Sequence, residues 1–91
     1  MSESSLRILV VDDERAIRRF LKVSLGNQYE VFEAVNGEEA LQAVATEHLD
    51  LVILDLGLPD MDGVDVTLRL REWTTIPIIV VSVREREDDK V

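Results

Sequence analysis

Apolar residues occur along the chain in two alternating patterns. Residues 8–11, 51–54 and 76–81 are short runs of consecutive apolar side chains, rich in valine and isoleucine. Such runs are typical of strands that are covered on both faces, as in parallel sheets. Residues 29–35 alternate more, with Glu33 among apolar neighbours, which predicts a strand nearer an edge of the sheet.

The segments between these runs show the spacing of amphipathic helices. Gly26 suits the end of the first helix, and Asn36 followed by Glu39 predicts the cap that starts the second. The third helix is expected to start near Gly63 and to end near Trp73. The apolar stripes expected to face the core are Ile17, Phe20, Leu21 and Leu25 in the first helix, Ala40, Leu41, Val44 and Ala45 in the second, and Val64, Leu68 and Leu70 in the third.

The resulting order, βαβαβαβ, predicts an α/β fold with a parallel sheet and right-handed crossovers. A doubly wound sheet with strand order 2-1-3-4 is the simplest arrangement of these elements. It puts the first and third strands side by side, and ligands of such sheets bind beyond the carboxyl ends of the strands.

Composition narrows the classes of protein and of site. The 91 residues suffice for one small domain, and the absence of cysteine excludes disulfides and thiolate metal sites. The net charge of −9 argues against binding of DNA or an anionic membrane by bulk charge. The chain has neither a secretory leader pattern nor a run near the roughly 18 apolar residues of a membrane span, so a cytoplasmic location is expected.

Three acids follow buried strands and are expected to meet at one edge of the sheet. Asp12 and Asp13 come after the first strand, and Asp55 ends the third. Two carboxylates about 4 Å apart repel by roughly 4 kcal/mol at an effective dielectric constant near 20. Either some of them are protonated or a cation lies among them, and oxygen ligands favour Mg²⁺. Asp13 could alternatively serve only as a helix cap.

A carboxylate beside Mg²⁺ can act as a nucleophile toward a phosphoryl group. Ser82 follows the last apolar run and is expected at the same edge, within reach of such a group on Asp55, although a serine there is often only a turn residue. The loop over residues 56–63 contains Gly57, Pro59 and Gly63, turn residues that allow a backbone carbonyl to approach the metal.

Three motifs at these positions resemble the receiver domain of bacterial two-component response regulators. They are LRILVVDDE at residues 6–14, DLVILDLGLPDMDG at residues 50–63 and PIIVVS at residues 77–82. The middle motif is most similar to the potassium-transport (Kdp-type) regulators of the winged-helix class. The resemblance implies a flavodoxin-like fold and a signalling role in transcription regulation, with the chain as phosphoacceptor and not as an enzyme acting on a separate substrate.

The resemblance also implies a role for each site residue. Asp55 would accept a phosphoryl group from a sensor histidine kinase that docks mainly along the first helix, near Arg18, Arg19 and Lys22. Asp13 would ligate Mg²⁺ directly, and Asp12 largely through water. Gly57 would offer its backbone carbonyl to the metal, and Ser82 would hydrogen-bond the phosphoryl group.

The chain is shorter than the family pattern. Residues 1–91 are expected to form a truncated receiver domain that lacks the fifth strand, the last helices, the family's lysine and the DNA-binding effector domain. Residues 76–81 would then be an exposed edge strand, which predicts self-association by edge pairing or by exchange of a terminal segment.

Other functions fit the residues less well. An aspartyl-phosphate hydrolase would need a second acid two residues after its nucleophile, but Gly57 stands there. A nucleotide-binding enzyme would need a glycine-rich loop after the first strand, where the chain has VDDERA. A shortened receiver that no longer switches and acts as a self-association or partner-binding module is the remaining alternative.

Overall fold

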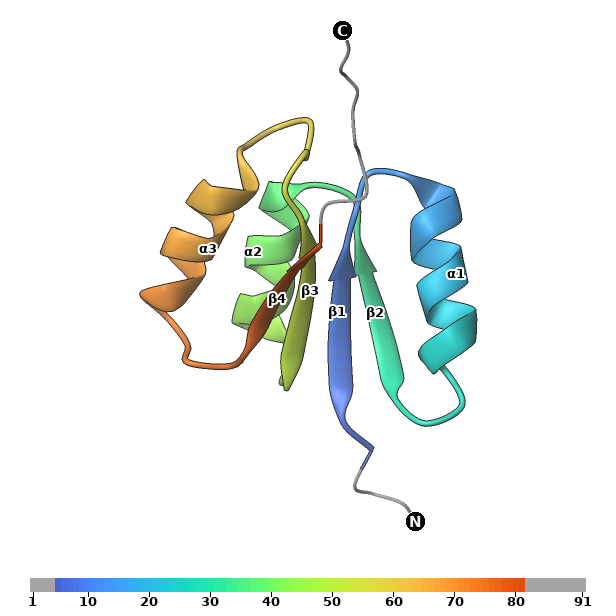
Figure 1. The fold of residues 1–91 in the computed structure, drawn as a ribbon. Helices are drawn as coiled ribbons and strands as arrows, with labels where there is room; N and C mark the ends of the chain where they lie inside the picture. The colour runs from blue at the N-terminus through green and yellow to red at the C-terminus, as the bar shows by residue number, and fades with distance from the viewer. Residues whose placement is uncertain (1–4, 82–91) are drawn as a thin grey trace, which may run out of the picture.

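Four parallel strands form one sheet in the order β2-β1-β3-β4, which confirms the predicted fold class (Figure 1). The structure is a computed structural model that describes residues 5–81. The strands are β1 (Arg7–Val11), β2 (Glu30–Ala34), β3 (Leu51–Asp55) and β4 (Ile78–Val81). The helices are α1 (Arg15–Leu25), α2 (Gly37–Thr46) and α3 (Gly63–Arg71).

The two faces of the sheet are covered unequally. Figure 1 shows α1 alone on one face and both α2 and α3 on the other. The main core lies under α2 and α3, whereas α1 has no fully buried residue. The buried core residues are Leu9, Val11, Ala34, Ala40, Leu49, Val52, Leu54, Leu58, Val66 and Leu70.

Four apolar helix residues expected in the core are exposed, namely Phe20, Ala45, Val64 and Leu68, so that part of the prediction is wrong. Phe20 in α1 is 65% exposed, and Val64 and Leu68 in α3 are 54% and 61% exposed. In α3 the inward positions are Val66 and Leu70, which are four residues apart and fully buried. The apolar pattern identified the helices correctly but did not show which apolar side chains have a neighbour to pack against.

Strand ends are set by local hydrogen bonds that compete with the sheet. The last strand begins at Ile78 and not at residue 76, because the Ile76 N–H donates to Thr74 Oγ1 and the Ile76 carbonyl accepts from Arg71. The second strand ends before residue 35, because the Val35 N–H donates to Glu39 Oε1 at 3.0 Å.

The predicted helix caps are confirmed in position. Asn36 Oδ1 accepts the N–H of Glu39 at 2.8 Å and so starts α2. Gly26 ends α1 with φ −65°, so this helix end does not use the left-handed conformation that glycine permits. None of the helices within residues 5–81 is long and apolar enough to cross a membrane.

Candidate metal and phosphoacceptor site

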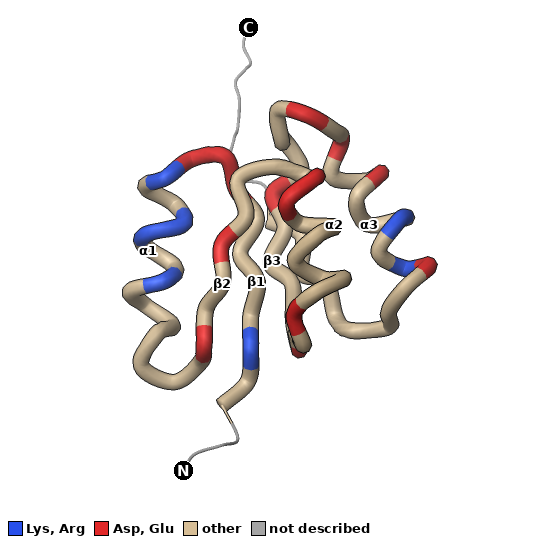
Figure 2. Tube along the Cα trace, turned by 180° about the vertical axis from the view of Figure 1, so that it is seen from behind, with Lys and Arg blue, Asp and Glu red and all other residues tan. Residues whose placement is uncertain are grey.

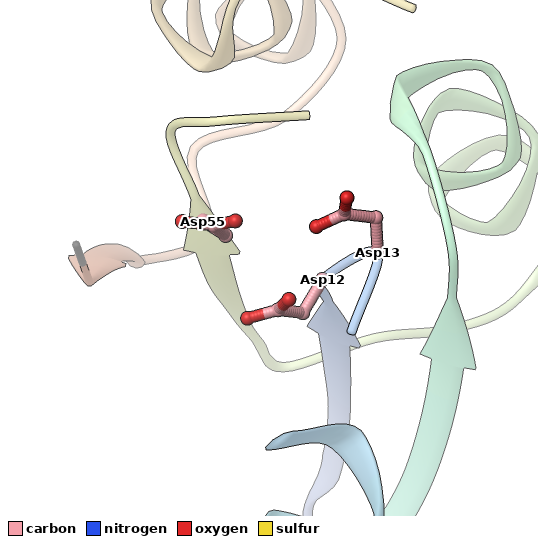
Figure 3. A group of neighbouring side chains, drawn as sticks. All are labelled: Asp12, Asp13 and Asp55. Carbon is pink, nitrogen blue, oxygen red and sulfur yellow. The ribbon is translucent and has the colours of Figure 1, made fainter. Parts of the chain in front are cut away.

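The register of the two central strands brings the acids together. Val11 of β1 lies opposite Leu54 of β3, so the next residue of each strand places Asp12 beside Asp55. In Figure 3 the side chains of Asp12 and Asp13 point toward Asp55 across the carboxyl ends of β1 and β3. Carboxylate oxygens of all three residues lie within 4.8 Å of one another. The predicted convergence of the three acids is therefore confirmed.

Burial makes this cluster electrostatically costly. Asp12 and Asp55 are only 5% and 3% exposed, whereas Asp13 is exposed to solvent. Burial raises the pKa of Asp12 and outweighs the lowering effect of its hydrogen bond from Glu14. The negative charges of Asp55 and Asp13 raise the pKa of Asp12 further. A cation bound among the three carboxylates would offset both effects.

The donor set fits a hard divalent ion. Three carboxylates with one side open to solvent supply only oxygen ligands and leave room for water, as Mg²⁺ requires. The chain has no cysteine and one histidine, so softer metals have few of their preferred ligands. Asp12, Asp13 and Asp55 are thus the residues that could hold Mg²⁺.

The turn between β1 and α1 is closed by Asp12. Its Oδ1 accepts the N–H of Glu14 at 2.9 Å, which leaves its second oxygen for other contacts. Glu14 is the N-cap residue of α1, and its side chain makes no capping hydrogen bond. Asp13 lies one residue before this N-cap position.

The loop over residues 56–63 folds back on the end of β3. The Gly63 N–H donates to the Leu56 carbonyl at 3.1 Å, and Leu58 is buried in the core. A side chain at residue 63 would put its Cβ 2.7 Å from Leu56 Cα, so only glycine allows this closure without a shift. Gly57 is exposed near the start of the loop, two residues after Asp55.

Asp60 ties the same loop to the start of α2. Its two carboxylate oxygens accept the N–H groups of Gly37 and Glu38 at 2.8 and 3.0 Å. These N–H groups lie in the first turn of α2 and have no partner within the helix. Hydrogen bonds from the main chain, chiefly from Gly37, lower the pKa of Asp60 below its usual value. Asp60 thus acts as a cap for a helix that begins 23 residues earlier.

Asp60→Asn is expected to lower the melting temperature at neutral pH, because the neutral amide caps the helix less well than the carboxylate. The pKa of Asp60 is lower in the folded than in the unfolded chain, so its contribution is present above the ordinary aspartate pKa. That contribution is lost as the pH falls through the folded value. Thermal melts of both chains between pH 7 and about pH 3 measure the difference, and a deficit that is equally large throughout would contradict the assignment.

Ser82 was predicted to belong to the site, and Asp60 was not. Ser82 lies outside the described residues, so its expected position beside Asp55 stays a prediction. Sequence reasoning did not identify Asp60, because its partners are far away along the chain. In the sequence, Pro59 and Asp60 indicated only a turn.

Comparison with known proteins identifies the family. The model of the response regulator receiver domain matches residues 8–91. The KDP operon transcriptional regulatory protein KdpE of Escherichia coli is 49% identical over 85 residues, which cover 92% of this chain and 38% of that protein. Transcriptional regulatory protein SrrA of Staphylococcus aureus is 42% identical over 88 residues, or 96% of this chain and 36% of that protein.

Solved structures agree with this identification. Response regulator TrrA of Thermotoga maritima, in complex with Mg²⁺ and BeF, is 42% identical with a TM-score of 0.81, covering 87% of this chain and 70% of that one. A CheY-like receiver domain from Methanospirillum hungatei is 33% identical with a TM-score of 0.79, covering 91% and 68%. The chain spans less than two fifths of the length of the curated relatives KdpE and SrrA. The acidic strand ends, the sheet order and these similarities together show that the chain belongs to the response regulator receiver domain family.

Proposed function

We propose that the chain accepts a phosphoryl group on Asp55 in the presence of Mg²⁺ and so serves as the phosphorylation-dependent signalling domain of a two-component response regulator. The observation that carries the proposal is the convergence of Asp12, Asp13 and Asp55 within 4.8 Å at the carboxyl ends of β1 and β3. The Mg²⁺ and BeF bound by the similar receiver TrrA support it, because BeF groups on a carboxylate mimic a phosphoryl group.

Asp55 has the position that a nucleophile needs. Asp55 ends a central strand, is only 3% exposed and lies beside two further acids. In the proposed reaction a carboxylate oxygen of Asp55 attacks phosphorus, the bond from phosphorus to the donor's imidazole nitrogen breaks, and that electron pair stays on the imidazole. The chain is the acceptor in this reaction and not an enzyme for a separate substrate.

The neighbouring acids hold the metal in the proposal. Asp13 would ligate Mg²⁺ directly, Asp12 largely through water, and Gly57 through its backbone carbonyl. When bound, Mg²⁺ neutralises the carboxylates and the charge that develops on the phosphoryl oxygens. Asp12 is kept in place for this task by its hydrogen bond from the Glu14 N–H. Ser82 is proposed to hydrogen-bond the phosphoryl group.

Labelling by acetyl phosphate tests the proposed function directly. The chain is expected to gain the mass of one phosphoryl group when Mg²⁺ is present, and to gain none when a chelator removes the metal. Intact-protein mass spectrometry measures both states, and beryllofluoride binding followed by NMR provides an independent measurement. Labelling that proceeds equally well without a divalent ion would contradict the proposal.

We propose α1 as the surface on which the sensor histidine kinase docks. Figure 2 shows that basic residues are concentrated along α1, although the chain as a whole carries a net charge of −9. A pocket of about 420 Å³ on this surface is lined by Arg15, Arg18, Arg19, Lys22, Val23 and Glu33. Val23 and the neighbouring Phe20 are 70% and 65% exposed, so the surface combines positive charge with apolar area. Such a surface suits an acidic and partly apolar partner.

The output of the signal is proposed by analogy with the relatives. KdpE and SrrA are transcriptional regulatory proteins, and this chain matches less than two fifths of their length. DNA would be bound through an effector domain that lies outside the matched part, and control of potassium transport is the proposed physiological role. A cytoplasmic location stays a prediction.

Self-association is a second proposed property, favoured by the exposure of β4. Within residues 5–81 no strand pairs with the outer edge of β4, and Ile79, Val80 and Val81 are 49%, 46% and 36% exposed. Open edges of this kind pair readily with other chains. The alternative function, a non-switching association module, rests on the same observation.

The 91-residue chain is expected to form dimers or larger species whose share rises with protein concentration and with salt, which screens the repulsion between acidic chains. Light scattering coupled to size-exclusion chromatography measures this. Val80→Lys should reduce the association, whereas Val23→Lys, at an exposed valine of α1, should not. A monomer at every concentration would contradict the proposal.

A further inference from the structure

Arg18 of α1 makes two hydrogen bonds, one to the acidic site and one to Glu33 of β2. Its guanidinium donates from one terminal nitrogen to the backbone carbonyl of Asp12 at 2.8 Å. Its Nε donates to Glu33 Oε1 at 3.0 Å. The Arg18 side chain is only 12% exposed, although it belongs to the basic surface of α1. Arg18 is therefore held on two sides and is not a freely solvated surface charge.

Glu33 fixes the direction of the guanidinium. It lies on β2, next to β1 in the sheet, and its two oxygens contact Arg18 at 3.0 Å and Lys22 Nζ at 3.5 Å. Because the guanidinium is planar, a bond at Nε restricts where its terminal nitrogens can point. The contact with Glu33 thus aims one of them at the loop that follows β1.

The carbonyl that Arg18 binds belongs to the peptide group joining Asp12 to Asp13. This peptide is planar, so fixing its carbonyl fixes the orientation of the whole unit and the directions in which the two neighbouring residues leave it. Asp12 is further held by its backbone N–H, which donates to the Ala34 carbonyl at 3.1 Å, and by the bond from its side chain to the Glu14 N–H. The bond from Arg18 differs from these two, because it is made by a long side chain that belongs to α1.

We infer that Arg18 is a positioning residue for Mg²⁺: its bond to the Asp12 carbonyl, directed by Glu33, orients the Asp12–Asp13 peptide so that both carboxylates face Asp55. The inference rests on the proposed metal function of the three acids. Arg18 itself touches neither the metal nor the phosphoryl group in this proposal. Groups that orient metal ligands in this way typically contribute about 10-fold to 100-fold in metal affinity.

The direction in which Mg²⁺ affinity changes when Arg18 is replaced distinguishes a positioning role from a purely electrostatic one. A cation near an acidic site repels Mg²⁺, so removal of a positive charge should by itself tighten Mg²⁺ binding. Loss of the positioning bond should weaken it. Arg19 provides a matched control, because it is the next residue of α1, carries the same charge, and is exposed.

The experiment compares Mg²⁺ affinity in the wild-type chain, Arg18→Gln and Arg19→Gln by isothermal titration calorimetry, at a temperature well below the melting point of each. Arg18→Gln is expected to raise the Kd for Mg²⁺ by about tenfold, whereas Arg19→Gln should leave it unchanged or lower it. NMR of the metal-free proteins adds a second readout. The amide signal of Glu14, which donates to Asp12 Oδ1, should shift in Arg18→Gln and stay in place in Arg19→Gln.

A Kd in Arg18→Gln that equals or falls below the wild-type value overturns the inference. If Arg18→Gln does not fold, the pair Arg18→Lys and Arg19→Lys decides, since both keep the charge and only the first loses the directed bond. Equal Mg²⁺ affinity in that pair likewise overturns the inference. Failure of the wild-type chain to bind Mg²⁺ is a different result, which overturns the proposed function and the inference with it.

Discussion

Asp55→Asn is expected to abolish Mg²⁺-dependent labelling by acetyl phosphate while the chain stays folded. The substitution keeps the shape of the side chain but replaces the carboxylate that attacks phosphorus, and no other acid of the cluster ends β3. Mass spectrometry of the intact protein measures the labelled fraction. Asp65→Asn, at an exposed acid in the first turn of α3, is the matched control and should be labelled as the wild type is.

The same variant should be more stable than the wild type when no metal is present. Asp55 lies within 4.8 Å of two other carboxylates, and a pair at about 4 Å repels by roughly 1 kcal/mol in water and roughly 4 kcal/mol at an effective dielectric constant of 20. Removing that charge should raise the melting temperature by several degrees, and added Mg²⁺ should narrow the difference. Labelling of Asp55→Asn at the wild-type level, or a lower melting temperature without metal, would contradict the assignment.

Leu54→Ala is expected to lower the free energy of unfolding by about 2–5 kcal/mol. Leu54 is the fourth of the five residues of β3 and is fully buried in the core under α2 and α3. Its replacement removes apolar contacts and leaves a cavity that the surrounding strands can fill only in part. Since small domains have total stabilities of about 5–15 kcal/mol, a substantial fraction of the chains could unfold. Urea denaturation followed by circular dichroism, at low protein concentration, measures the change.

Leu68→Ala is the control for this prediction. It makes the same substitution at a side chain that is 61% exposed on α3, so its effect should stay within about 0.5 kcal/mol. Equal losses in the two variants would mean that Leu68 packs against something in solution. Self-association through α3 would then be the first explanation to examine.

Much of the fold follows from local sequence. The three apolar runs are strands because they are apolar on both faces, and the sheet order follows from the alternation of strands and helices. The convergence of Asp12 and Asp55 follows in turn, because parallel neighbours end at the same edge and Val11 lies opposite Leu54. What remained wrong was the orientation of Phe20, Ala45, Val64 and Leu68, whose burial depends on neighbours that no local pattern specifies.

The side-chain bonds around the site could not be predicted in the same way. Asp60 reaches Gly37 and Glu38 because the loop after β3 crosses the start of α2. Arg18 reaches Asp12 because Glu33 on a neighbouring strand directs it. Each of these contacts needs two or three elements to be in place first, so it depends on tertiary structure and not on residue type or spacing.

The concentration of basic side chains on α1 has a kinetic consequence. Arg15, Arg18, Arg19 and Lys22 lie on this helix, whereas the chain as a whole carries a net charge of −9, so the electrostatic potential near α1 is more positive than the net charge suggests (Figure 2). A charged molecule that diffuses toward it is turned before contact, and an acidic one is drawn to the side of α1. This steering weakens as the Debye length shortens from about 30 Å at 0.01 M salt to about 8 Å at 0.15 M. Ionic strength should therefore change the rate of association at α1 more than the rate of dissociation.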